Sequence, residues 1–210
     1  MKDASPAGAA EVSSFLATGE KITGFAYDPF TDHFFLRLAP GNLIRVVDRP
    51  ARAVKREFVV AGLPANGGGD LAVKPRTGHI FFLHADEARV SESTRLGKWE
   101  RSFKLEGLTS PPQGIAYDAT RDELLVLDGT SNAEARITRY DFEGRRGSTI
   151  ALAQAVQPSL AFDSDTREIY APLAGAGGEV GVFDEQGRLL RKLHGGRWID
   201  VGPRSFVRVF

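Results

Sequence analysis

The chain contains no cysteine. That absence excludes disulfides, thiolate metal sites and a cysteine nucleophile. No apolar run approaches the roughly 20 residues that a membrane helix needs, so we expect no membrane insertion. The first residues, "MKDASPAGAAEVSS", hold a single lysine and no apolar run, and they therefore do not make an intact signal peptide. Such a start fits an exported bacterial protein or a cytoplasmic one.

A surplus of charge is also missing, because 27 Lys and Arg residues balance 27 Asp and Glu residues. Nucleic-acid binding generally needs a basic surplus on one face, so we expect no nucleic-acid partner. The 210 residues, of which 42% are hydrophobic, are enough for one substantial all-β domain with its own core. We expect residues 1–10 to be a flexible segment and residues 11–210 to form a single domain.

What the chain does have is a repeat. The segments "GFAYDP", "DLAVKP", "GIAYDA" and "SLAFDS" begin their apolar runs at Phe25, Leu71, Ile115 and Leu160, with separations of 46, 44 and 45 residues. A second apolar run follows each one in the same register, as "HFFLRL", "HIFFLH", "ELLVLD" and "EIYAPL". The turns between them, such as "KPRTGH", contain residues that favour tight hairpins. Alternating side chains with β-branched and aromatic content favour strands, and we find no convincing amphipathic helix.

Each unit then contains two further strands, although the third strand of the second unit, "ARVSEST", is polar. Four short antiparallel strands in a repeat of about 45 residues are typical of β-propeller blades, because one blade cannot cover both of its apolar faces. We therefore predict an all-β propeller with complete blades at 22–61, 68–107, 112–153 and 157–194. The innermost strands should carry two layers of core side chains: Phe25, Tyr27, Leu71, Val73, Ile115, Tyr117, Leu160 and Phe162.

The two ends of the chain predict a partial fifth blade. The segment "VSSFLATG" resembles a fourth strand, and "RSFVRVF" places Phe206 46 residues after Leu160, in the register of an innermost strand. First and fourth strands run antiparallel, so residues 12–18 and 204–210 are expected to pair and close the ring. The alternative is a ring of four blades with unpaired ends. A partial blade leaves a short open edge, which predicts a homodimer contact or the addition of a partner strand.

The pattern G-I-A-Y-D-x-x-x-x-x-L-L-V-L-D, from Gly114 to Asp128, resembles blades of the NHL-repeat and gluconolactonase-like propellers. The resemblance extends roughly from Ile22 to His194. It implies the architecture, whereas members of these families act as scaffolds, ligand-binding proteins or lactonases. Known members commonly carry six blades, and this chain is too short for six. Gluconolactonase-like members hold one metal over the channel with carboxylate and amide oxygens, which suits calcium.

Ligands of propellers bind where the loops meet at one end of the axial channel. The polar and aromatic candidates in these loops are Asp70, His84, Asp86, Gln113, Asp128, Asn132, Ser159 and Trp198. If a metal binds, its candidate ligands are Asp70, Asp86 and Asp128, because they come from equivalent loops of adjacent blades. In the other interpretation, Asp70 and Asp128 cap their own turns through side-chain to backbone hydrogen bonds. Trp198 either offers a stacking surface or fills the core.

The four histidines do not form a recognisable metal motif. His33 and His79 share a repeat position that holds glutamate in the other two units, which indicates a solvated strand end. His84 lies near Asp86, but no H-x-H or H-E-x-x-H spacing exists, so zinc is not indicated. The chain also has no G-x-S-x-G segment of the kind that positions a nucleophilic serine.

These observations favour a non-enzymatic propeller that binds a protein or a small ligand at its loop face and needs no cofactor. The alternative is a divalent-metal-dependent, lactonase-like hydrolase with calcium at the channel mouth. A dense catalytic constellation would favour the second class, and the sequence offers none.

Overall fold

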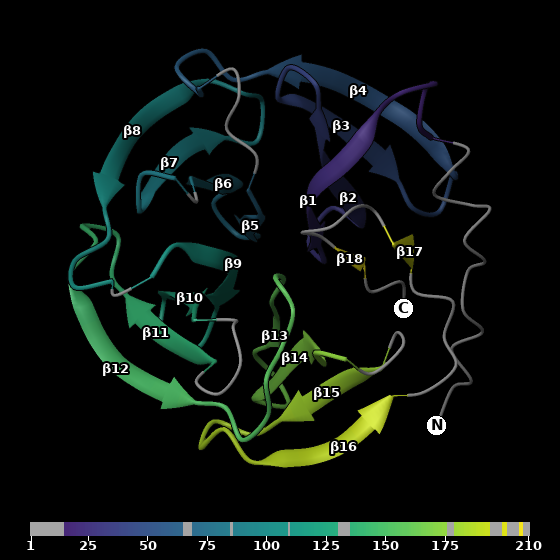
Figure 1. Cartoon of the computed structure of the whole chain (residues 1–210). Coiled ribbons are helices and arrows are strands. Elements are labelled where there is room, and N and C mark those ends of the chain that lie inside the picture. The colour runs from purple at the N-terminus through teal and green to yellow at the C-terminus, as the bar shows by residue number, and fades with distance from the viewer. Residues whose placement is uncertain are drawn as a thin grey trace.

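The computed structural model describes residues 15–64, 69–84, 86–108, 110–129, 135–175 and 179–193, together with the backbone of residues 199–200 and 206–207. It contains four antiparallel sheets of four strands each, arranged as blades around one axis (Figure 1). This arrangement confirms the predicted β-propeller and its four complete blades. Nowhere in the described residues is there a helix with the length and hydropathy of a membrane span.

Within each blade, the strands pair in the order in which they follow along the chain. Blade one consists of β1 (Lys21–Asp28), β2 (His33–Ala39), β3 (Leu43–Asp48) and β4 (Ala53–Val59). Blade two consists of β5 (Leu71–Lys74), β6 (His79–His84), β7 (Arg89–Thr94) and β8 (Trp99–Lys104). Blade three consists of β9 (Pro112–Asp118), β10 (Glu123–Asp128), β11 (Arg136–Tyr140) and β12 (Arg146–Ala151). Blade four consists of β13 (Ala161–Asp163), β14 (Glu168–Pro172), β15 (Val180–Phe183) and β16 (Leu189–Leu193).

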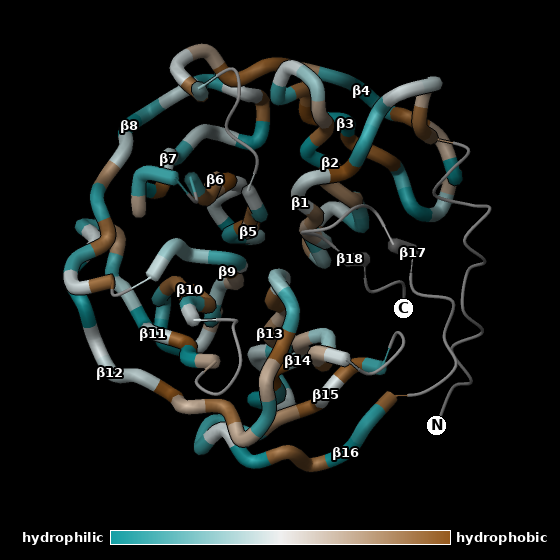
Figure 2. The backbone as a smooth tube through the Cα atoms, viewed as in Figure 1, coloured by the Kyte–Doolittle hydropathy of each residue, from teal (hydrophilic) through white to brown (hydrophobic). Residues whose placement is uncertain are grey.

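The first strand of each blade is innermost, as predicted. The strand β5 contacts both β1 and β9, and β9 contacts β13. The predicted core residues Leu71, Val73, Ile115 and Leu160 are buried, although Leu160 lies just before β13. The other four, Phe25, Tyr27, Tyr117 and Phe162, are half-buried. The fourth strands lie at the rim and are largely exposed, and Figure 2 shows hydrophilic and intermediate residues along most of β12.

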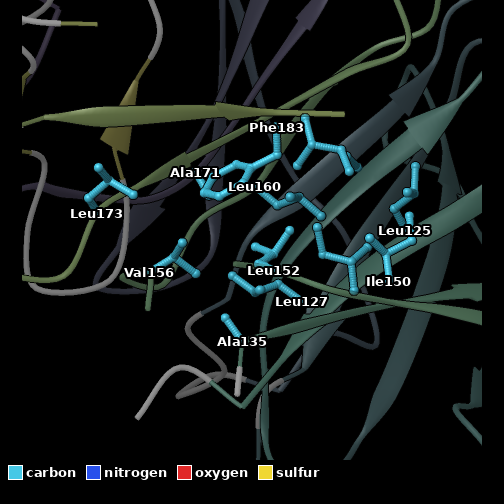
Figure 3. Close-up of a cluster of buried hydrophobic side chains, with 13 residues drawn as sticks. Leu125, Leu127, Ala135, Ile150, Leu152, Val156, Leu160, Ala171, Leu173 and Phe183 are labelled. Carbon is cyan, nitrogen blue, oxygen red and sulfur yellow. The ribbon is translucent and has the colours of Figure 1, made fainter. Parts of the chain in front are cut away.

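Apolar clusters between neighbouring blades form the core. The cluster between blades one and two includes Phe35, Ile44, Ile80 and Phe82, all 0% exposed. The cluster between blades three and four joins side chains of both blades, including Leu125 and Phe183 (Figure 3). A further cluster joins blades two and three, so consecutive blades bury the apolar faces that they turn toward each other, which is the physical reason for the repeat.

The polar segment "ARVSEST" also forms a third strand, because β7 pairs with β6 over residues 89–94 and with β8 over residues 89–93. Its side chains Ser91, Glu92 and Ser93 are all buried. At the repeat position of Ser93, blades one, three and four carry Val47, Tyr140 and Phe183. The interior of blade two is thus more polar than that of its neighbours.

The described residues do not form the predicted partial fifth blade from both ends of the chain. The strand β18 (Phe206–Val207) pairs with β17 (Ile199–Asp200) and lies beside β1 (Figure 1). Residues 15–18 form no strand, and residues 12–14, 204–205 and 208–210 lie outside the described residues. Phe15 and Leu16 do pack against the apolar face of blade one. Closure of the ring by both termini stays a prediction.

Candidate functional site

The axis of the propeller is occupied by the carboxylate of Asp70, one of the predicted site residues. Its Oδ1 accepts hydrogen bonds from the amides of Leu71 (2.9 Å) and Phe25 (3.4 Å), and its Oδ2 accepts one from Ile115 (3.2 Å). The amide of Leu160 also donates to this carboxylate. One side chain therefore binds the innermost segments of all four blades.

The repeat explains why only one blade supplies such a side chain. Asp70 occupies the position that is glycine in blades one and three, at Gly24 and Gly114. A Cβ atom at Gly24 would lie 2.7 Å from the oxygen of Gly69, and one at Gly114 would lie 2.9 Å from the nitrogen of Leu160. The innermost segments approach so closely that glycine is required at these two positions.

The environment of Asp70 does not suit a calcium ligand. Both oxygens face amide protons, and a hard cation needs the lone pairs that these protons occupy. Burial raises the pKa of Asp70 to about 7, even though the four amides act to lower it. Asp86 is exposed, and Asp128 lies 3.8 Å from Nε of Arg136. Asp70, Asp86 and Asp128 therefore do not fit a calcium ion as a set.

The described residues contain one group of three His, Asp or Glu side chains whose ligand atoms lie within 4.8 Å of one another, namely His79, Glu92 and Glu100. Nδ1 of His79 pairs with Glu92, which also accepts a hydrogen bond of 2.7 Å from Arg101.

Blade three pairs the same two positions across its strands, because Glu123 lies 3.4 Å from Arg139. This repeat position therefore takes part in cross-strand side-chain pairs, and the related His33 is only 6% exposed. The prediction of a simple solvated strand end was wrong.

The predicted site residue His84 lines a groove between blades one and two. The groove has a volume of about 550 Å³, within the usual range for small-ligand sites. Its lining residues are Ala61, Gly62, Pro64, His84, Glu87, Arg89, Ser91, Trp99 and Ser102. The first three follow β4 of blade one, and the other six belong to blade two. We call this cavity the blade 1–2 groove.

His84 is 3% exposed, and its Nε2 lies 2.8 Å from Oγ of Ser91. Its Nδ1 is buried and has no hydrogen-bond partner among the described residues. Burial lowers the pKa of His84 to about 4, and the nearby charge of Arg37 adds to this effect. The imidazole is therefore neutral at physiological pH.

Arg37 connects the axis with the blade 1–2 groove. Its guanidinium is fully buried and donates to the backbone oxygens of Gly69 (3.2 Å) and Leu83 (3.0 Å). It also donates to Oδ1 of Asn42 (3.0 and 2.8 Å), and the amide of Asn42 donates to the oxygen of Pro64 in the groove wall. Arg37 thus holds the loop of blade one against the strand ends of blade two.

Four predicted site residues remain: Gln113 and Ser159 lie in or next to the innermost strands, and the other two lie outside the described residues. Gln113 is half-buried at the start of β9 and donates a hydrogen bond of 3.3 Å to the oxygen of Pro111. Ser159 is buried at the repeat position of Asp70. Asn132 and Trp198 fall outside the described residues.

The site residues predicted from the sequence include His84 but not its neighbours in the groove, Arg89, Ser91, Trp99 and Ser102. The usable signal was the polar character of "ARVSEST", which breaks the apolar pattern of the third strands.

The sequence matches no protein-family model, and no curated protein sequence matches it. Solved structures with a similar fold include the Myxococcus xanthus glutaminyl cyclase (TM-score 0.62, 16% identity, 84% of this chain and 71% of that chain). The nidogen/laminin complex (TM-score 0.61, 19%, 85% and 66%) and the Kuenenia stuttgartiensis hydrazine synthase (0.55, 17%, 87% and 52%) are similar too. The chain thus spans about half of the hydrazine synthase chain.

These proteins are named for different functions, so the likeness does not select between an enzyme and a binding protein. It does show the fold: the chain is a β-propeller, with the architecture that its resemblance to NHL-repeat and gluconolactonase-like propellers implied.

Proposed function

We propose that the protein is a non-enzymatic β-propeller that binds a small ligand in the blade 1–2 groove. The observation that carries the proposal is the groove itself, which brings the half-exposed indole of Trp99 together with the polar side chains of Arg89 and Ser102. A concavity of about 550 Å³ is large enough for a small ligand.

The location and shape of the groove support the same conclusion. His84, Glu87 and Arg89 come from the end of β6 and the loop to β7, on the face where loops of neighbouring blades meet. Trp99 is 43% exposed and contributes an aromatic wall. A mostly apolar concavity with a few polar groups is the usual form of a small-ligand site.

The state of His84 favours binding over catalysis. A general base works best when its pKa lies near the working pH. The pKa of His84 is lowered to about 4, so its imidazole is a poor base for activating the neighbouring Ser91 at neutral pH.

The test is a thermal-melting screen of small aromatic fragments against the native chain and a variant with a filled groove, Ser102→Phe. A fragment present at 100 times its Kd adds about 2.7 kcal/mol of stability, which raises the melting temperature by roughly 5–10 °C for a chain of this size. We expect at least one fragment to stabilise the native chain but not Ser102→Phe.

The matched control is Thr149→Phe, because Thr149 pairs with Thr138 in blade three as Ser102 pairs with Ser91 in blade two. Thr149→Phe should keep the fragment response. If every fragment that stabilises the native chain also stabilises Ser102→Phe, the groove is not the site. Conversion of a bound fragment to a product, detected by mass spectrometry, would contradict the non-enzymatic part of the proposal.

A further inference from the structure

Blade two carries a cluster of metal-ligating side chains on the face that points away from the blade 1–2 groove. The cluster consists of His79 from β6, Glu92 from β7 and Glu100 from β8. Glu92 follows Ser91, which lines the groove, and successive residues of a strand point to opposite faces of the sheet. Each member offers one ligand atom, and these atoms lie within 4.8 Å of one another. The cluster is therefore separate from the proposed ligand site.

Strand pairing brings the first two members together. His79 pairs with Thr94, and Glu92 lies two residues before Thr94, on the same face of the sheet. Diagonal neighbours of this kind are within reach of long side chains. Nδ1 of His79 accordingly pairs with Oε1 of Glu92.

A β-bulge supplies the third member. In β8, Arg101 pairs with Glu92 while Glu100 has no register partner, so Glu100 is the extra residue of the bulge. A bulge can turn a side chain toward a site. Oε2 of Glu100 lies 3.7 Å from Nε2 of His79, and the two side chains are 34% and 30% exposed. An ion in solution can therefore reach both of them.

Arg101 holds Glu92 in an orientation that suits a metal ligand. Glu92 is 4% exposed, and its Oε2 accepts a hydrogen bond of 2.7 Å from Nε of Arg101, whereas Oε1 faces His79. Carboxylates that bind metals in proteins are commonly held by hydrogen bonds of this kind. Arg101 also lies 3.9 Å from Glu143 of blade three. Three carboxylates thus surround one guanidinium, which leaves a negative charge that attracts a cation.

The other blades carry different chemistry at these positions. The position of Glu92 is occupied in blades one, three and four by Val46, Arg139 and Val182. At the position of Glu100, blade one has Lys55, whose Nζ lies 3.0 Å from Nε2 of His33, the equivalent of His79. A buried glutamate where two blades have valine is a costly substitution, so it indicates a requirement other than folding.

We propose that His79, Glu92 and Glu100 bind one Zn²⁺ ion. Zinc takes imidazole nitrogen and carboxylate oxygen at about 2.0–2.2 Å, and three protein ligands with one water complete a tetrahedral site. The ligand atoms of such a site lie roughly 3.3 Å apart, a distance that the partly exposed side chain of Glu100 can reach by a small movement. Calcium and magnesium prefer oxygen ligands alone, so the imidazole selects against them. Zinc in this site links β6, β7 and β8 and stabilises blade two.

The test is a titration of the metal-free chain with zinc chloride, followed by calorimetry and by thermal melting. We expect one zinc ion per chain and a melting temperature that rises with zinc concentration, because an ion that binds only the folded chain stabilises it. His79→Gln and Glu100→Gln should each weaken zinc binding at least about tenfold, since even changes to the hydrogen-bond partners of metal ligands cost about 10–100-fold. Glu100→Lys, which introduces the residue of blade one, should abolish binding.

Matched controls come from blade one and from the groove. His33→Gln changes the equivalent histidine of blade one and should leave zinc binding unchanged. Ser102→Phe fills the groove and should bind zinc like the native chain, which separates this proposal from the proposed function. In ¹⁵N spectra, zinc should shift the ring nitrogens of His79 but not those of His33. Thermal melting without zinc identifies any variant that does not fold, and Glu100→Gln changes a partly exposed side chain without changing its shape.

Each outcome supports or overturns the zinc site. Loss of zinc binding in His79→Gln and Glu100→Gln, with binding retained in His33→Gln and Ser102→Phe, supports it whatever the fragment screen finds. Absence of zinc binding at millimolar concentration overturns it. Zinc binding that survives both His79→Gln and Glu100→Gln also overturns it, because the ion then binds elsewhere. Calcium binding as tight as zinc binding overturns the choice of ion.

Discussion

Replacement of Asp70 by asparagine tests the role of the axial carboxylate. Two oxygens of Asp70 accept amide hydrogen bonds from segments of all four blades. At acid pH Asp70 is protonated, and its hydroxyl oxygen can still accept a hydrogen bond. Asparagine keeps one oxygen, but its amino group can only donate, so about two backbone N–H groups lose their acceptor. Each unsatisfied buried N–H costs about 1–3 kcal/mol, which predicts a loss of about 2–6 kcal/mol for Asp70→Asn at acid pH.

The pKa of Asp70 adds a pH dependence with a definite sign. The pKa is raised from 3.8 to about 7 by burial, so the unfolded chain releases this proton at a lower pH than the folded chain. Stability from this group is therefore complete below about pH 4 and is lost as the pH rises to 7. Over this window the loss amounts to about 4 kcal/mol. Asp70→Asn has no such group, so the advantage of the native chain over the variant should shrink as the pH rises.

Urea unfolding at pH 4, 6 and 8, followed by far-UV circular dichroism, measures both effects. The difference in unfolding free energy between the native chain and Asp70→Asn is the relevant quantity, because other titrating groups cancel in it. Asp86→Asn serves as the control, since Asp86 is exposed. Parallel pH profiles for the native chain and Asp70→Asn would refute the reasoning about the pKa, and a loss below 1 kcal/mol at pH 4 would refute the role in joining the blades.

Three further predictions concern the axis, a metal and the chain ends. Gly114→Ala should destabilise the fold by about 1–3 kcal/mol in the same urea assay, because its Cβ would lie 2.9 Å from the nitrogen of Leu160. Gly147→Ala should cost less, because its Cβ would lie 3.3 Å from the oxygen of Arg139 at an exposed position. Millimolar calcium and chelator should both leave the melting temperature of the zinc-free chain unchanged, since Asp70 faces amide protons; a rise equivalent to about 2.7 kcal/mol would instead support the metal-dependent hydrolase. Deletion of residues 204–210 should lower the melting temperature sharply and change self-association by gel filtration, and no change in either would contradict closure of the ring by the termini.

The sequence predicted the blades because each depends on a local signal that recurs. Phe25, Leu71, Ile115 and Leu160 mark the innermost segments by their spacing, and the structure places all four around the axis. The partners of polar side chains depend instead on contacts between blades, which no local pattern contains. The sequence therefore predicted Asp70 as a site residue or a turn cap, and its hydrogen bonds to all four blades could not be predicted.

The groove was harder to predict because its two walls come from different blades. Its first wall is the loop after β4, and its second is formed by β6, β7 and β8. Trp99 looked like an ordinary residue of an outer strand, and nothing in its sequence neighbours indicates that Gly62 lies against it. Only the ring arrangement brings these residues together.

Departures from the repeat nevertheless point to the same place as the geometry. Arg37 stands where the other blades have Leu83, Leu127 and Pro172, and His84 stands where they have Leu38, Asp128 and Leu173. Asp70 stands where the other blades have glycine or serine. Ser93 stands where they have large apolar residues.

All four departures are buried, and they occur in blades one and two. A repeat needs only the consensus side chains to fold, so costly polar substitutions at buried positions indicate a requirement other than folding. Asp70 joins the innermost segments of the four blades at the axis, and one such side chain is enough for this. Arg37 has no polar equivalent in the other blades, whereas the position of His84 also carries a buried polar residue in blade three, Asp128. Arg37 contacts the wall of the blade 1–2 groove through Asn42 and Pro64, so this departure from the repeat supports the assignment of the binding site to blades one and two.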